Sequence, residues 1–257
     1  MNKKINPNKS EKKLRLDPDN VFQFNCDPSV PCYTKCCQDV TIALTPYDVL
    51  RLKNALGISS DEFLDKYTVT LSMEKRLIPM VVLKMNEQDK KCPFVTNGGC
   101  SVYDDRPWPC RMFPLDVNDD GTFSIITDSS RCKGIEEDRK WRISDWLISQ
   151  GVPIYDEIIG LFSEVTNPLR AQDLDIDNPQ IHQMVFMSLY NLDKFRDFVF
   201  KSTFLDRFEL EDIAVEKIKR NDLELLKFAF NWIKFGIFGQ KVFQVRQDAL
   251  PKNLEKE

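Results

Sequence analysis

The sequence predicts an α+β fold that is mostly helical, in which an irregular cysteine-rich domain with a few short strands precedes a helical carboxy-terminal region. All eight cysteines lie between Cys26 and Cys132. Two short apolar runs with β-branched residues, 78–85 and 122–127, predict strands that pair as a small sheet beside the cysteine loops. From Glu136 onward the apolar residues recur at helical spacing.

Changes in composition along the chain predict three segments. Residues 1–20 are polar and rich in lysine, which is typical of a disordered tail. The cysteines place one domain at 21–150, and the helical pattern fills 151–257.

Capping residues mark the first two helices. Thr45 is a good N-cap, Pro46 suits the first helical position, and Gly57 is a typical stop. A second short helix is expected from Ser59 or Ser60 to Tyr67.

Helical periodicity predicts the remaining elements. One helix is expected to carry Trp141, Asp145 and Trp146 and to end at Gly151, and others are expected at about 154–164, 179–200, 207–219 and 221–238. The last one is apolar around most of its circumference, with one narrow polar stripe of Glu224, Lys227, Asn231 and Lys234. Such a helix must be covered on several sides. It is expected to be a central core helix, and a homo-oligomer or partner-protein surface on the carboxy-terminal helices is the alternative.

Charge and hydropathy restrict the classes of partner. The formal net charge is −4 with both signs mixed, whereas a nucleic-acid partner normally requires a concentrated basic surface. No apolar run approaches the length of a membrane span, and residues 1–16 lack the apolar core of a signal peptide. We therefore expect a cytoplasmic protein with neither a membrane nor a nucleic acid as partner.

In a reducing cytosol, clustered cysteines are more often metal ligands than disulfides. Thiolates on short loops can converge on one centre, which is how iron–sulfur clusters and structural zinc are held. The domain at 21–150 is therefore expected to bind a metal ion or a cluster, although some of the cysteines could instead be buried apolar residues. The candidate ligands are Cys26, Cys32, Cys36, Cys37, Cys92, Cys100, Cys110 and Cys132.

The adjacent pair Cys36 and Cys37 limits the geometry. Neighbouring side chains usually diverge, so both reaching one ion would be awkward. One of them would ligate a first centre, and the other would ligate a second centre or stay free.

Two arginines, Arg106 and Arg111, lie among the cysteines and are candidate cofactor-binding residues. Several thiolates carry negative charge, which guanidinium groups would stabilise. Pairing of these arginines with nearby aspartates such as Asp104 and Asp105 is the alternative. No general base is evident, so catalytic residues stay unassigned, and the lone histidine, His182, is expected to be a surface or packing residue.

The cysteine region resembles the YkgJ-like cysteine-cluster family, also described as the CxxCxxCC or zinc- and iron-chelating domain family. The resemblance rests on the double cysteine Cys36–Cys37, the segment LTPYDVLRLKNALGIS, the strings CPF and GCSVYDDRPWPCRMFP, and Cys132. It covers residues 22–150. The first four cysteines depart from the family pattern, since five residues separate Cys26 from Cys32 and three separate Cys32 from Cys36.

The resemblance implies an iron–sulfur cluster, with 4Fe–4S the expected type, or zinc as the alternative. Similar proteins are often labelled iron–sulfur oxidoreductases, and some flagellin lysine methylases look similar in this region. This sequence has only nine glycines, no glycine-rich nucleotide loop and no CxxxCxxC motif. Two functions therefore stay open: an iron–sulfur oxidoreductase or electron carrier, and a zinc- or iron-chelating protein without catalytic activity. In a third interpretation, the helical region is an interaction module that the metal-binding domain stabilises.

Overall fold

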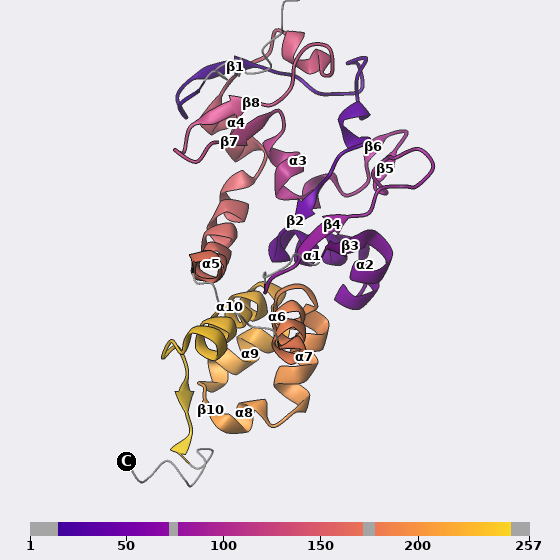
Figure 1. The fold of residues 1–257 in the computed structure, drawn as a ribbon. Helices are drawn as coiled ribbons and strands as arrows, with labels where there is room; N and C mark the ends of the chain where they lie inside the picture. The colour runs from indigo at the N-terminus through magenta and orange to yellow at the C-terminus, as the bar shows by residue number, and fades with distance from the viewer. Residues whose placement is uncertain (1–14, 72–76, 172–177, 248–257) are drawn as a thin grey trace, which may run out of the picture.

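The computed structural model describes residues 15–71, 77–171 and 178–247, and their fold is mostly helical α+β, as the sequence predicted (Figure 1). The helices are α1 Pro46–Leu56, α2 Ser60–Tyr67, α3 Trp108–Met112, α4 Ile143–Ser149, α5 Val152–Ala171, α6 Pro179–Tyr190, α7 Leu192–Lys201, α8 Phe204–Arg207, α9 Asp212–Arg220 and α10 Asp222–Phe238. The strands are β1 Val21–Gln23, β2 Ala43–Leu44, β3 Thr68–Leu71, β4 Met80–Leu83, β5 Val95–Thr96, β6 Gly99–Cys100, β7 Leu115–Val117, β8 Phe123–Ile125, β9 Lys140–Arg142, β10 Phe208–Glu209 and β11 Gln244–Val245. Three 3-10 turns complete the description: η1 Lys35–Cys37, η2 Tyr103–Asp105 and η3 Lys133–Glu136.

The caps predicted for α1 and α2 are confirmed. The Thr45 hydroxyl accepts from the Asp48 N–H at 3.1 Å, and the Asp48 carboxylate accepts from the Thr45 N–H at 2.7 Å. This reciprocal capping box satisfies two backbone donors at the start of α1. Gly57 ends the helix at φ 65°, a left-handed conformation that glycine adopts without strain.

Loss of the cap hydroxyl provides a first prediction. Thr45→Ala should lower the free energy of unfolding by about 1 kcal/mol, because the Asp48 N–H loses its acceptor. Urea denaturation measures the change, and Thr45→Ser, which keeps the hydroxyl, is the matched control. Equal loss in both variants would contradict the capping role.

The two predicted strands form, but the prediction that they pair with each other was wrong. Strand β4 lies between β2 and β3, with Ala43 opposite Val82 and Thr68 opposite Leu83. Strand β8 forms a hairpin with β7 instead. The short turn at 118–121, with Gly121 at φ 80°, makes this local pairing available to β8.

The helix expected to carry Trp141 was also wrong at this residue, because Trp141 lies in strand β9. It pairs with Phe22 of β1, and its indole N–H donates to the Phe24 carbonyl at 3.0 Å. The expected helix at 179–200 is two helices separated at Asn191, whose side chain caps α7. The helix expected at 207–219 begins only at Asp212, after α8 and β10.

Two hydrophobic cores organise the described residues. The large one joins α1, α2 and the β2–β4–β3 sheet to helices α5–α10. The small one is built from Leu16, Phe22, Phe24, Met112, Leu115, Phe123, Cys132, Ile143, Trp146 and Val152. Helix α5 runs from the small core at Val152 into the large core at Tyr155 (Figure 1). Helix α5 therefore contributes residues to both cores.

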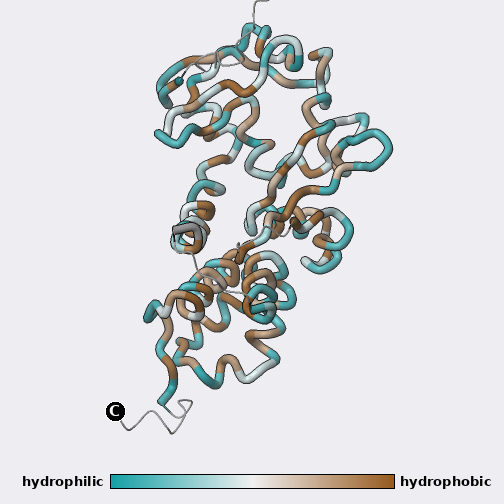
Figure 2. The backbone as a smooth tube through the Cα atoms, in the orientation of Figure 1, coloured by the Kyte–Doolittle hydropathy of each residue, from teal (hydrophilic) through white to brown (hydrophobic). Residues whose placement is uncertain are grey.

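Helix α10 is the central core helix that its apolar pattern predicted. It contacts α1, α5, α6, α7 and α9, and it buries Leu225, Leu226, Phe228, Ala229, Phe230 and Ile233. Figure 2 shows many hydrophobic segments in this region, whereas the loop beside β5 and β6 is hydrophilic. A partner surface on the carboxy-terminal helices stays a prediction. Among the helices described, none is both long and apolar enough to span a bilayer.

Residues 15–20, the carboxy-terminal end of the tail expected over 1–20, contact the folded chain. Leu16 is buried in the small core and exchanges two backbone hydrogen bonds with Phe123. These contacts fix residues 15–20 to the fold, and the rest of the expected tail lies outside the described residues.

Candidate metal centre

All eight cysteines are free thiols, and three of them lie together beside the small core. The Lys133 N–H donates to the Cys32 sulfur at 3.0 Å, which brings Cys32 to the segment that follows Cys132. The Asn25 N–H donates to the Gly134 carbonyl at 2.9 Å, which brings the residue before Cys26 to the same place. Cys26, Cys32 and Cys132 therefore form one group, called here the upper group, although Cys132 is about a hundred residues from the other two.

Three other cysteines, called here the lower group, pack against the large core: Cys92, Cys100 and Cys110. Cys100 lies in the β5–β6 hairpin, where it pairs with Val95. Val95 is three residues after Cys92, so the hairpin brings Cys100 back toward Cys92. Cys110 lies on α3, whose first residue, Trp108, donates its N–H to the Asp48 carboxylate at 2.8 Å. Asp48 thus fixes the helix that carries Cys110 to the start of α1.

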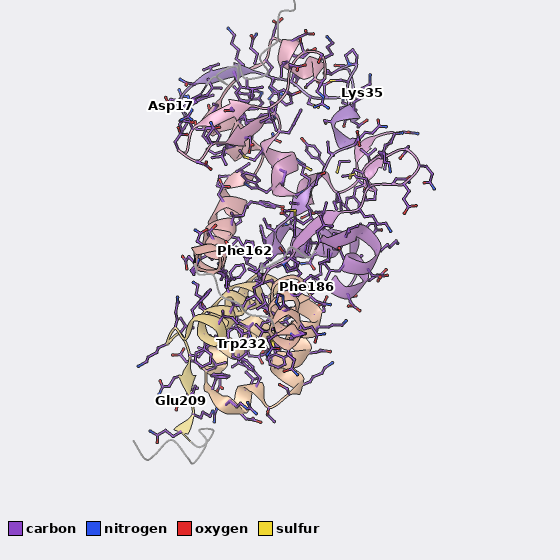
Figure 3. The ribbon with its side chains drawn as sticks, viewed as in Figure 1. Asp17, Lys35, Phe162, Phe186, Glu209 and Trp232 are labelled. Carbon is purple, nitrogen blue, oxygen red and sulfur yellow. The ribbon has the colours of Figure 1, made fainter. Side chains whose placement is uncertain are left out.

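The η1 turn holds Cys36 and Cys37 between the two groups. Lys35, the first residue of η1, is labelled in Figure 3, and in Figure 1 this part of the chain lies above the β5–β6 hairpin. Thr34, before the turn, has φ 64°, a left-handed conformation that redirects the chain into η1. After the turn, the Cys92 N–H donates to the Cys37 carbonyl at 2.8 Å and Gln38 pairs with Lys91.

Tyr33 packs the same loop against the hairpin. A β-carbon placed on Gly99, which has φ 113°, would lie 2.4 Å from the Tyr33 hydroxyl. The positive φ favours glycine there, and any side chain would also displace the Tyr33 hydroxyl. The hydroxyl of Tyr33 therefore lies directly over the residue that precedes Cys100.

The electrostatics of the thiols reflect these two groups. Burial and, after it, the charges of Cys36, Cys132 and Cys32 together raise the pKa of Cys26 to about 12. Burial, followed by the charges of Cys92, Cys100, Asp48 and Cys36, likewise raises the pKa of Cys110 to about 12. Thiols that raise one another's pKa are protonated when no cation is present, and a bound metal would replace their protons.

The donor set suits a soft metal, since thiolates are the ligands that zinc and iron–sulfur clusters share. In the part of the chain that the structure describes, no three cysteine, histidine or acidic side chains converge closely enough to hold one ion. The thiols are thus neighbours within each group, and they do not form a closed cage for a single ion in this conformation.

The two candidate arginines lie in different surroundings. Arg106 is buried, which lowers its pKa, and the nearby charges of Cys110 and Cys100 oppose that lowering. Its guanidinium stacks on the Tyr103 ring at 3.9 Å. Arg111 donates to the carbonyls of Arg106, Gln150 and Asp104 at 2.9, 2.7 and 2.5 Å. Of the aspartates considered as alternative partners, Asp105 pairs with Arg51. A cofactor role stays a prediction for both arginines.

Two residues beside the thiols, Asp48 and Tyr33, escaped the sequence analysis. Asp48 is fully buried, its pKa is raised by that burial, and it binds Thr45 and Trp108. Three positions separate it from the predicted cap Thr45, so the capping-box pattern could have identified it. No sequence signal marks Tyr33, because its contact with Gly99 is made across 66 positions of the chain.

Free thiols gathered on two neighbouring cores are typical of a cysteine-rich metal-binding domain. Residues 25–137 match the CxxCxxCC family, described as "Putative zinc- or iron-chelating domain". This segment contains all eight cysteines, and the match confirms the resemblance inferred from the sequence. The similarity to the CxxCxxCC family therefore covers residues 25–137 of the chain. Comparisons with curated proteins and with solved structures found no match.

Proposed function

We propose that the protein carries an iron–sulfur cluster, of the 4Fe–4S type, held by cysteines of this domain, and that it acts as an oxidoreductase or electron carrier. The observation that supports the proposal is the gathering of free thiols into two groups, with no histidine among them. An all-thiolate donor set is the usual ligand set of a 4Fe–4S cluster. When bound, such a cluster would accept and release single electrons.

A cluster and a single ion require different spacings of their thiolate ligands. Around zinc, four thiolates at about 2.3 Å from the metal lie only about 3.8 Å from one another. A cluster places iron and sulfide between its ligands, so its thiolates stand further apart. A cluster therefore does not require thiols that close around one ion.

The surrounding residues would support a charged cluster. Arg106 is buried near Cys100 and Cys110 and would offset negative charge at the lower group. Trp108 and Phe94, on the large core, would restrict water at the same side. Solvent exclusion and neighbouring charge are two of the factors that set a cluster's potential. The free thiols also support a reducing compartment such as the cytoplasm.

Anaerobic purification tests the proposal. We expect a brown protein that absorbs near 400 nm, contains iron and acid-labile sulfide in equal amounts, and bleaches reversibly with dithionite. Exposure to air should remove the colour. A protein that contains neither iron nor sulfide, before and after reconstitution with both, would contradict the cluster.

Zinc chelation is the second candidate, favoured by the description of the matched family. A colourless protein with zinc bound as purified, and with no absorbance change on adding dithionite, would support it. Four-thiolate zinc sites are structural, so the protein would then have no redox role of its own.

A further inference from the structure

We propose that Cys32 and Cys132 are a redox-active dithiol, which a low-molecular-weight disulfide converts into a disulfide bond and which excess thiol restores. Cys32 is the attacking thiol of this pair and Cys132 is the resolving thiol. The inference concerns the chain without bound metal, so it does not depend on the proposed cluster. It adds a thiol–disulfide exchange reaction to the cysteine-rich domain.

The first support is the direct contact of the two thiols. The thiols of Cys32 and Cys132 hydrogen-bond each other, and the Lys133 N–H donates to the Cys32 sulfur at 3.0 Å. Because the Lys133 nitrogen is only about 2.4 Å from the Cys132 Cα, the Cys32 sulfur lies within about 5.4 Å of that Cα. A small rotation of the side chains is therefore enough to bring the two sulfurs together.

Backbone hydrogen bonds hold the two segments beside each other. The Asn25 N–H donates to the Gly134 carbonyl at 2.9 Å, and the Cys132 N–H donates to the Asp128 carbonyl at 2.9 Å. These bonds do not involve the two sulfurs, so the segments stay in place while the thiols react. A disulfide that forms without movement of the backbone stores little strain.

The two thiols differ in their access to solvent. Cys32 is partly exposed, whereas Cys132 is 5% exposed and belongs to the small core. An oxidant in solution therefore meets Cys32 first, and Cys132 reacts with the sulfur that contacts it. Redox-sensing cysteines often combine an accessible thiol with a resolving thiol next to it. Disulfides of this transient kind also form in reducing compartments.

The reaction proceeds in two exchange steps. The Cys32 sulfur attacks one sulfur of the oxidant RSSR, which forms a mixed disulfide on Cys32 and releases the first RSH. The Cys132 sulfur then attacks the Cys32 sulfur, which closes the protein disulfide and releases the second RSH. Two protein thiols are oxidised, one RSSR is reduced to two RSH, and the two thiol protons leave on the released thiols.

The other pair of thiols in contact is less suited to the same reaction. Cys36 and Cys37 also hydrogen-bond through their side chains, but they are neighbours in the chain. The Cα atoms on either side of a trans peptide bond are about 3.8 Å apart, whereas a disulfide usually holds them about 4.4–6.8 Å apart. Closing that bond would distort the η1 turn, so we expect the Cys32–Cys132 disulfide to form first.

Oxidation of the full-length chain by glutathione tests the proposal. The chain is reduced, freed of metal with a chelator in the absence of oxygen, and equilibrated in mixtures of oxidised and reduced glutathione. Free thiols are then alkylated, and digestion with trypsin and an Asp-specific protease isolates Cys32 in residues 27–35 and Cys132 in residues 132–133. Mass spectrometry should find these two peptides linked in most chains when oxidised glutathione predominates, and unlinked in excess reduced glutathione.

Three variants test the roles within the pair. Cys132→Ser should stop after the first step and carry one glutathione per chain, on Cys32. Cys32→Ser should leave Cys132 as a free thiol, because its burial keeps the oxidant away. Cys26→Ser is the matched control, since Cys26 belongs to the same group of thiols, and this variant should form the Cys32–Cys132 link as the wild type does.

Other patterns would overturn the proposal. A wild-type chain in which Cys32 and Cys132 stay unlinked at every glutathione ratio, or in which Cys26 or Cys36 replaces either partner, would do so. A Cys132→Ser variant whose Cys32 takes up no glutathione would overturn the attacking role. The wild-type peptide map requires no variant to fold, and circular dichroism shows whether each variant keeps its helices.

Failure of this proposal can be distinguished from failure of the proposed function. Iron and sulfide are measured on the protein as purified and after reconstitution, whereas the link is measured on the chain without metal. A protein that binds a cluster but forms no link would overturn only the dithiol. A protein that forms the link but binds neither iron nor sulfide would overturn only the cluster.

Discussion

Cys110→Ser is expected to release the metal bound by the lower group and to lower the free energy of unfolding by several kcal/mol. Cys110 lies on α3 between the β5–β6 hairpin and the start of α1, so a metal bound there would link three elements. Binding energy at such a site is also folding energy, on the order of 10 kcal/mol for structural zinc in small domains. Metal analysis and urea denaturation measure the two effects, and Cys100→Ser should behave in the same way.

The matched control is the same comparison without metal. Serine has nearly the shape of cysteine, so the metal-free variant and the metal-free wild type should unfold within about 1 kcal/mol of each other. Ser101→Ala, at the residue after Cys100, should keep the full metal content. Full retention of metal in both Cys100→Ser and Cys110→Ser would show that these thiols are not ligands.

Elements defined by signals within a few residues could be predicted from the sequence. Thr45, Pro46 and Gly57 predicted both ends of α1, and the apolar circumference of 221–238 predicted the buried helix α10. Pairings between distant segments could not be predicted in this way. Trp141 has a spacing that fits a helix, and its strand conformation depends on a partner, β1, that lies more than a hundred residues earlier.

The same limit applies to the candidate site. The sequence identified all eight cysteines, and it indicated that adjacent Cys36 and Cys37 would be hard to place on one ion. It did not indicate that Cys32 lies beside the segment after Cys132, or that Cys37 lies opposite Cys92, because both contacts depend on the folded chain. Asp48 was missed for a similar reason, since its bond to Trp108 joins residues 60 positions apart.

Gly134→Ala is expected to lower the free energy of unfolding by about 2–3 kcal/mol and to weaken metal binding at the upper group. A β-carbon at this position would lie 2.3 Å from the Asn25 carbonyl oxygen and 3.1 Å from the Phe24 ring. The obstructing atom belongs to the backbone, so no side-chain rotation relieves the overlap, and overpacking of this kind costs about 1–3 kcal/mol. The chain would have to separate where Asn25 donates to Gly134, one residue from Cys26 and two from Cys132.

Urea denaturation and iron content of the reconstituted protein measure these effects, and Gly98→Ala is the control. Gly98 also lies among the cysteines, but a β-carbon there would meet its nearest neighbour, the Thr96 hydroxyl, at an ordinary 3.8 Å. Gly98→Ala should therefore change neither stability nor metal content appreciably. If Gly134→Ala binds metal as the wild type does, the close approach of the Cys26 and Cys132 segments is not what brings the thiols of the upper group together.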